Sequence, residues 1–218
     1  MKKAAGGSDW KDGFLFVGNE LALDFVNTRP VRDGQPEELL PDLRALLRWF
    51  QAAAVLRPGE AARLTRQWSG TARAGRVFQA ARKLRETLRR DVLAWEKTGA
   101  IRRSTVEGLN ALLARHPMRE RLRKRGRAAV REPWFQTRLP EDLLGPLAHS
   151  AATLFTAADR KRVRKCAQCV LHFRDTSKKG TRRWCSMNMC GNREKVAAYA
   201  ARQRSRPRAG KSRGPGAR

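Results

Sequence analysis

The only four cysteines of this 218-residue chain lie close together, as Cys166-x2-Cys169 and Cys185-x4-Cys190. A zinc ion prefers four tetrahedral ligands, and two close pairs let one chain segment supply four thiolates with little strain. Four thiolates leave no open position for water or substrate. The spacing therefore predicts a structural Zn2+ held by Cys166, Cys169, Cys185 and Cys190.

Two other interpretations of the cysteines are two disulfides or four unrelated buried thiols. Disulfides need an oxidising compartment. The first residues are polar and contain glycine, without the apolar stretch of an export signal. No run approaches eighteen apolar residues. We therefore expect a cytoplasmic protein with reduced thiols and no membrane segment, and we expect His172, between the pairs, to face solvent or pack beside the metal turn.

The residues around the second pair resemble a known family. Arg182-Arg183-Trp184 precedes Cys185, and the tetrapeptide Cys190-Gly191-Asn192-Arg193 resembles the one for which the CGNR zinc finger is named. The stretch 21–28, LALDFVNT, is similar to the start of the ABATE domain that usually precedes such fingers in bacteria. The resemblance implies a stress-linked transcription regulator that binds nucleic acid. Relatives often carry extra residues in the first cysteine pair, which is compact in this chain. This difference should alter the turn between the two cysteines without affecting metal binding.

These features predict a mainly α fold with small β hairpins (α+β), in which a helical N-terminal domain precedes a treble-clef-like zinc finger. We expect a disordered N-terminus (1–13), an ABATE-like helical domain (14–159), a CGNR-type finger (160–204) and a disordered basic tail (205–218). Residues 160–204 are called the cysteine module below.

Apolar spacing and capping residues locate the elements. Residues 14–26 are ambiguous between a strand followed by a helix and two strands. A strand with a plausible hairpin is predicted at 130–139, and two short strands, 163–165 and 171–174, flank the first cysteine pair. The predicted helices are one from Asp42 onward, then 60–68, 76–97 ended by Gly99, one with Ser104 as N-cap, 141–158 and 194–204.

The charge of the chain indicates which partners it can attract. The chain carries 48 Lys and Arg against 20 Asp and Glu, a formal net charge of +28, so polyanions are attracted to it. From Arg160 to Arg218 there are 19 basic and 2 acidic residues. Solubility alone would not concentrate charge around a metal site, so this region is the predicted nucleic-acid footprint.

Two groups of residues are candidate nucleic-acid contacts. On the helix after Cys190, Asn192, Arg193, Lys195 and Arg202 would reach base edges and phosphates. Before Cys185, Lys178, Lys179, Arg182 and Arg183 form a basic loop suited to phosphates. Asn192 and Arg193 have an equally weighted structural interpretation, as the turn and brace of the finger. Trp184 is expected to cover the metal site as apolar packing.

The N-terminal region supplies a weaker functional hint. Asn19, Glu20, Asp24 and Asn27 lie beside apolar residues, where polar groups orient a ligand or, as we favour, cap turns and helices. No catalytic motif or phosphate-binding glycine loop is present, so we expect no enzyme.

The leading hypothesis is a DNA-binding bacterial regulator with a sensor or partner-binding domain. The alternatives are an RNA- or ribosome-associated protein and a zinc-stabilised interaction module. A homodimer would read two half-sites. The sequence identifies no effector.

Overall fold

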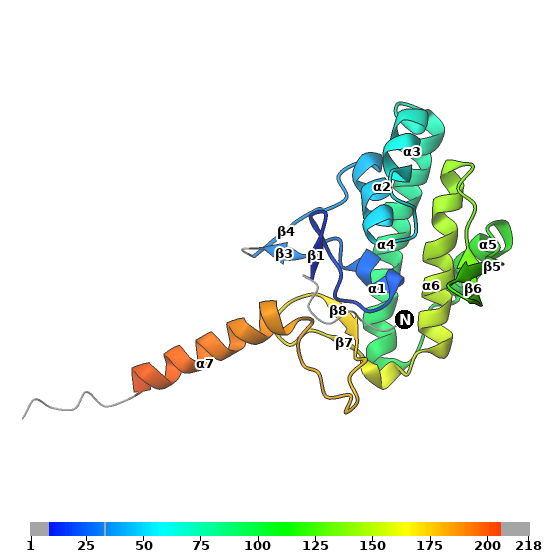
Figure 1. Ribbon diagram of the computed structural model, residues 1–218. Coiled ribbons are helices and arrows are strands. Elements are labelled where there is room, and N and C mark those ends of the chain that lie inside the picture. Colours follow the sequence, from blue (N-terminus) through cyan, green and yellow to red (C-terminus); the bar gives the residue numbers. More distant parts are fainter. Residues whose placement is uncertain (1–8, 33, 206–218) are drawn as a thin grey trace, which may run out of the picture.

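The structure, a computed structural model, describes residues 9–32 and 34–205. Its longest helix, α4, has 27 residues and so spans about 40 Å. Four helices, α1, α2, α5 and α6, pack against α4, while α3 packs on α2 and α5 also packs on α6 (Figure 1). The helix bounds are α1 Leu21–Val26, α2 Leu43–Ala52, α3 Glu60–Trp68, α4 Ala72–Thr98, α5 Arg103–Arg115, α6 Leu144–Ala157 and α7 Asn192–Ser205.

All strands of the described residues occur as two-stranded antiparallel hairpins. The predicted mainly α fold with small hairpins is confirmed. Residues 14–26 form a strand and then a helix, which resolves the ambiguity in favour of the first alternative. The pairs are β1 Trp10–Lys11 with β2 Phe14–Leu15, β3 Val31–Arg32 with β4 Gln35–Pro36, β5 Arg119–Arg125 with β6 Ala128–Trp134, and β7 Val163–Lys165 with β8 His172–Arg174.

Aromatic packing fixes the upper part of the core. Trp49 of α2 is fully buried, and its ring lies 5.3 Å from Phe25 of α1 and 5.1 Å from Phe50, centroid to centroid. Phe16, just after β2, stacks on the same indole at 6.2 Å. One side chain thus joins α1, α2 and the first hairpin.

Capping explains the bounds of α4. The Thr71 hydroxyl accepts a hydrogen bond from the Ala74 amide at 3.3 Å, so the helix begins four residues before the predicted start. At the other end Gly99 adopts a left-handed conformation with φ of 79° and donates to the Trp95 carbonyl at 2.8 Å. The predicted glycine cap is confirmed.

The predicted N-cap of α5 is wrong. The helix begins at Arg103, with Arg102 at the N-cap position and Ser104 inside the first turn. The reason is a tertiary contact. Asp91 of α4 is buried, accepts from Arg102 Nε at 2.6 Å and also bonds the Thr105 hydroxyl. Anchoring on both sides of Ser104 pulls the start of the helix toward α4.

Two further bounds differ from expectation. The strand predicted at 130–139 is β6, Ala128–Trp134, which pairs with β5 along seven residues. Disorder was predicted for residues 1–13, but Trp10–Lys11 forms β1, because Trp10 packs against the cysteine module. Residues 1–8 and 206–218, where the rest of the predicted terminal disorder falls, lie outside the described residues.

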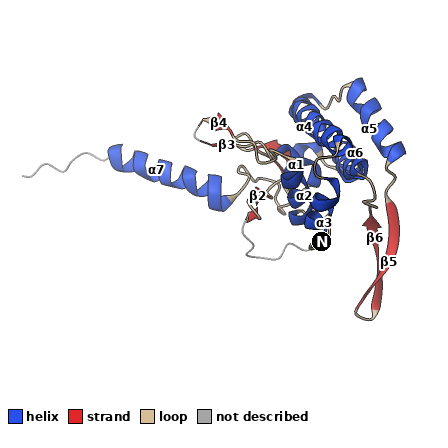
Figure 2. Cartoon of the chain, turned by 90° about the horizontal axis from the view of Figure 1, so that it is seen from above, coloured by secondary structure: helices blue, strands red, loops and turns tan. Residues whose placement is uncertain are grey.

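Helix α7 and the β5–β6 hairpin extend from opposite sides of the molecule (Figures 1 and 2). Helix α7 follows directly on the last cysteine turn. Within the described part of the chain, no helix is both long and apolar enough to cross a membrane.

Two glycine substitutions test the packing around α1. A Cβ on Gly18 would lie 2.8 Å from the Asp24 backbone nitrogen, so Gly18→Ala should lower the free energy of unfolding by about 2 kcal/mol. Gly75, inside α4, has no heavy atom within 4 Å of its added Cβ, so Gly75→Ala should raise it by about 1 kcal/mol. Urea unfolding of both variants measures the difference, and equal effects would contradict the packing described for Gly18.

Candidate metal centre

The β7–β8 hairpin presents the first cysteine pair. Cys166 directly follows β7, and its amide donates to the Leu171 carbonyl at 2.8 Å, so the ladder closes around the turn. Cys169 lies in that turn, half-buried, whereas Cys166 is buried. The short spacing of the pair places both thiols on the same side of the hairpin end.

A single π-helical turn, Met187–Gly191, presents the second pair. Ser186 caps this turn, since its hydroxyl accepts from the amides of Asn188 and Met189 at 3.1 and 3.3 Å. A Cβ on Gly191 would lie 2.7 Å from the sulfur of Met187, so this exposed, flexible side chain would have to shift to admit one. The turn holds Cys190 in place and leads directly into α7.

The four sulfur atoms fit one tetrahedral ion. They lie within 4.8 Å of one another, and the Cys169–Cys185 and Cys185–Cys190 Sγ distances are both 3.7 Å. Four thiolates at about 2.3 Å from a zinc ion would be about 3.8 Å apart. The Cys185 amide also points at Cys166 Sγ from 3.3 Å, which stabilises a thiolate. The four predicted ligands are thus together, with the spacing that a metal ion requires.

The thiols influence one another's ionisation. Hydrogen bonds from Cys169 and Cys185 lower the pKa of Cys166 far below its ordinary value. The contact with Cys166 raises the pKa of Cys169 to about 12 and raises that of Cys185 as well. Four thiols this close cannot all lose their protons unless a cation lies between them. The donor set therefore fits a thiolate-binding divalent metal.

The apolar cover of the cysteines comes from two distant parts of the chain. Leu171 and Phe173 belong to the module itself, whereas Leu15 and Val17 come from the first hairpin and the segment after it. Trp184 packs against the same cluster, in agreement with its expected role as cover. The module therefore shares its core with the N-terminal residues.

Polar groups of the N-terminal segment bind β8. The Asn27 side-chain amide donates to the His172 carbonyl at 2.8 Å, and its oxygen accepts from the His172 amide at 2.9 Å. Asn19 donates to the Arg174 carbonyl at 2.7 Å, and Glu20 forms an ion pair with the Arg174 side chain. Three of the polar residues considered for a ligand pocket or for capping thus join the helices to the cysteine module, whereas the fourth, Asp24, accepts a hydrogen bond from the Gly18 amide at 2.6 Å.

His172 is buried beside this joint. Its side chain is 3% exposed, and neither ring nitrogen has a hydrogen-bond partner. Of its two predicted positions, facing solvent or packing beside the metal turn, the structure shows the packed one. Burial, with Arg89 and Lys165 nearby, lowers the pKa of His172 to about 4. The carboxylate of Glu96 lies 3.7 Å away, too far for a hydrogen bond.

Most of the predicted nucleic-acid contacts are exposed. Along α7, a spacing of three and four residues places Asn192, Lys195 and Arg202 on one face, together with Tyr199. Glu194, about 100° around the helix from Lys195, is hydrogen-bonded to Gln168 of the cysteine module. The exposed members of the predicted set are Lys178, Lys179, Arg183, Asn192, Arg193, Lys195 and Arg202.

Arg182 differs from its neighbours. Its guanidinium lies 4.5 Å from the Phe173 ring centroid and donates to the carbonyls of Trp184 and Cys185. These contacts engage the side chain inside the module, so its structural role is to support the loop that leads to Cys185.

Sequence reasoning missed the residues that shape the basic loop. Asp175 is buried and accepts from the amides of Ser177 and Arg182 at 2.9 and 2.8 Å. Arg164 donates to the Gly180 carbonyl at 2.8 Å, and Arg162 donates to that of Ser177 at 2.7 Å. Two of the module's basic residues thus hold the basic loop in place through its backbone carbonyls. The only signal was a single acid, Asp175, in a basic stretch.

Two family models match the chain. The model named ABATE, described as "Putative stress-induced transcription regulator", matches residues 19–158. The model of the CGNR zinc finger matches residues 162–203. A search of curated proteins found no match. The first match covers more than half of the chain, and the second contains all four cysteines.

Removing the metal should loosen both halves of the shared core. The wild-type protein should bind one equivalent of Zn2+, and Cys185→Ser should lose it. Because Leu15 and Val17 cover the cysteines, hydrogen exchange of amides 14–17 should then accelerate about tenfold or more. Mass spectrometry of exchanged peptides measures this, with α3 peptides as the internal reference. Unchanged exchange in 14–17 would show that the metal does not support that segment.

Titration of His172 should contribute to acid destabilisation. Its pKa is about 4 when folded and 6.5 ordinarily, so the unfolded chain binds more protons between these values. Its stabilising contribution is complete above pH 6.5 and decreases as the pH falls toward 4, by roughly 2 kcal/mol between pH 7 and 5. His172→Gln should reduce the pH dependence of the free energy of unfolding by that amount. Zinc release affects both proteins, and equal pH dependence would contradict the prediction.

Proposed function

Since the chain belongs to the ABATE family and carries a CGNR zinc finger, we propose that it is a zinc-dependent transcriptional regulator whose finger binds DNA. The observation that carries this proposal is α7, a helix that follows directly on the metal-binding turn and projects away from the body of the protein (Figure 2).

Zinc is the proposed ion because four thiolates in a tetrahedral arrangement are the donor set it prefers. The residues that would hold it are Cys166, Cys169, Cys185 and Cys190. The ion would cross-link the β7–β8 hairpin to the turn before α7. Because four thiolates leave no coordination position open, we propose binding rather than catalysis as the function. A cytoplasmic location is proposed with it, since reduced thiols persist there.

The proposed recognition helix is α7. Its outward face carries Asn192, Lys195, Tyr199 and Arg202, and Arg193 is exposed next to Asn192, about 100° around the helix. An α-helix fits the major groove of B-DNA, where an asparagine amide can pair with adenine and basic side chains reach guanine or phosphate. The metal turn would fix the N-terminal end of α7, where the first of these residues lie.

The basic loop would contact the phosphates beside that groove. Lys178 and Lys179 are exposed at its tip, and Arg183 is exposed beside the ring of Trp184. The hydrogen bonds of Asp175 and Arg164 hold the loop in one shape. A held loop contributes to the register of the protein on DNA, because its charges keep their position relative to α7.

The helical domain is proposed to act as a sensor or partner-binding domain. Four hydrogen bonds join residues 18–27 to the backbone of β8 and connect the helical domain directly to the finger. A ligand or partner that displaces α1 would therefore displace β8 and the cysteines after it. No effector is assigned.

A second candidate function is protein binding by the same helix. Val196 and Tyr199 of α7 are 67% and 58% exposed, and both lie near its outward face. An exposed apolar pair on an otherwise polar helix favours contact with an apolar surface, such as that of a second copy of the chain. A homodimer formed this way would occupy α7 and compete with DNA.

In vitro selection from random duplex DNA distinguishes these functions. We expect the zinc-loaded wild type to enrich a defined motif and Arg193→Gln/Lys195→Gln to lose it. The matched control Arg66→Gln/Arg90→Gln removes the same charge from exposed residues of α3 and α4, and should retain the motif.

The salt dependence of duplex binding adds a quantitative test. Two lost phosphate contacts reduce the slope of log K against log salt by about 1.8, whereas the control variant should leave it unchanged. Recovery of duplexes without a motif by all three proteins would contradict sequence-specific binding. Tighter binding of structured RNA than of any selected duplex would favour the RNA-associated alternative.

A further inference from the structure

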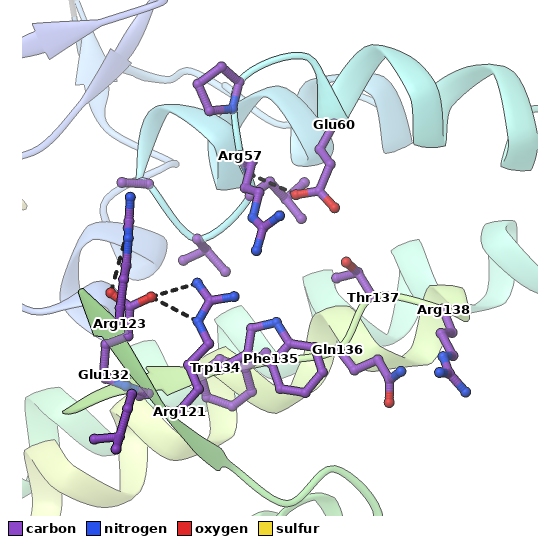
Figure 3. A pocket seen from close by; sticks show the side chains of 16 residues that line it. Arg57, Glu60, Arg121, Arg123, Glu132, Trp134, Phe135, Gln136, Thr137 and Arg138 are labelled. Atoms are coloured by element: carbon purple, nitrogen blue, oxygen red, sulfur yellow. Dashed lines mark hydrogen bonds and ion pairs between the residues drawn. The ribbon is translucent and has the colours of Figure 1, made fainter. Parts of the chain in front are cut away.

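A groove of about 1050 Å3 lies between the β5–β6 hairpin and the turn that joins α2 to α3. It is lined by residues 54–58 and Glu60 on one side and by residues of the hairpin and the segment after it on the other (Figure 3). None of its residues belongs to the cysteine module, and α7 extends from the opposite side of the molecule (Figure 2).

The hairpin wall carries a regular row of arginines. Arg119, Arg121, Arg123 and Arg125 occupy alternate positions of β5 and therefore share one face of the ribbon. Successive members of the row are about 7 Å apart, since a strand rises about 3.4 Å per residue. From position 119 to 131 the hairpin has seven basic residues and one acidic residue. Evenly spaced cations suit evenly spaced anions, as in a polymer with a charged backbone.

The opposite wall also presents positive charge. Arg57 extends from the α2–α3 turn into the groove, toward the side on which Arg121 lies (Figure 3). Glu60 accepts from the Arg57 amide, at 2.8 Å. Across the groove, Glu132 is shared by Arg121 and Arg123, at 2.5 and 3.6 Å. Cations that face each other across a groove repel, and an anion between them removes that repulsion.

Aromatic side chains lie at the base of the same groove. Trp134 ends β6, with the guanidinium groups of Arg119 and Arg121 each 6.0 Å from its ring centroid, and Phe135 follows it. Leu122 of β5, which also lines the groove, is 76% exposed. A basic channel with aromatic rings is the arrangement by which proteins hold single-stranded nucleic acid, whose unpaired bases can stack on them.

We propose that this groove binds a single strand of nucleic acid, with its phosphates along the β5 arginines and Arg57 and its bases toward Trp134 and Phe135. Arg121 and Arg123 line the groove, and Arg119 and Arg125 continue their row along β5, which exceeds what one small anion would use. A duplex has its bases already stacked and would meet only the outer edge of the groove. The site is independent of the proposed finger–DNA contact, because it uses neither zinc nor α7.

Binding of a short oligothymidylate to the full-length, zinc-loaded protein tests the site. Arg57→Gln/Arg123→Gln removes one charge from each wall and leaves the Arg121–Glu132 pair intact. We expect its slope of log K against log salt to be smaller than that of the wild type by about 1.4, since single strands lose about 0.7 per phosphate contact. Arg66→Gln/Arg90→Gln, the charge-matched control, should keep the wild-type slope. Equal slopes for all three proteins would overturn the proposal.

Cross-linking locates the strand directly. A photoreactive oligothymidylate should cross-link to peptides within 119–138 of the wild type, and these adducts should decrease at least fivefold in Arg57→Gln/Arg123→Gln. Cross-links confined to 160–218 would overturn the site. The site would also be overturned if Arg57→Gln/Arg123→Gln lost as much affinity for a blunt duplex as for the oligothymidylate. Motif selection by Arg57→Gln/Arg123→Gln reports on the finger separately, so either proposal can fail without the other.

Discussion

The cysteine module depends on apolar cover that it does not contain. A segment of this size buries too little surface to fold without a metal ion or a neighbouring core. Here Leu15 and Val17 complete the cover over the thiols, and the Asn27 side-chain amide binds both the amide and the carbonyl of one β8 residue, His172. The position of the metal ligands, and of α7 after them, follows from these contacts. The proposed DNA-binding part is therefore held in a fixed position on the helices.

The elements with strong local signals were predictable from the sequence. The spacing of the cysteines predicted their cluster, and Gly99 marked the end of α4 because only glycine adopts that left-handed conformation easily. The start of α5 was wrong by two positions, because buried Asp91 of another helix determines it. Local patterns contain no information about such a partner.

In the candidate site too, residues with a local sequence signal were predictable, and residues whose role depends on a distant partner were not. All four ligands were predictable from spacing, whereas the role of Asn19, Glu20 and Asn27 was not, since their partners are about 150 residues away. The exposed lysines of the basic loop were predictable from charge alone. The internal role of Arg182 was not, because its chemistry equals that of its exposed neighbour Arg183, and only the contacts with the Phe173 ring and the carbonyls of Trp184 and Cys185 distinguish it. The groove beside β5 depends on the register of two strands, and so it too required the structure.

The shared core also sets an order of events during synthesis. Val17 leaves the ribosome 149 residues before Cys166, its neighbour in the apolar cluster. At bacterial rates of up to about 20 residues per second, this delay is on the order of ten seconds. During that time the first hairpin has no apolar surface of the module to cover it, and Asn27 has no peptide to bind. Completion of the N-terminal fold therefore waits for the last quarter of the chain, and capture of the metal ion coincides with that final step.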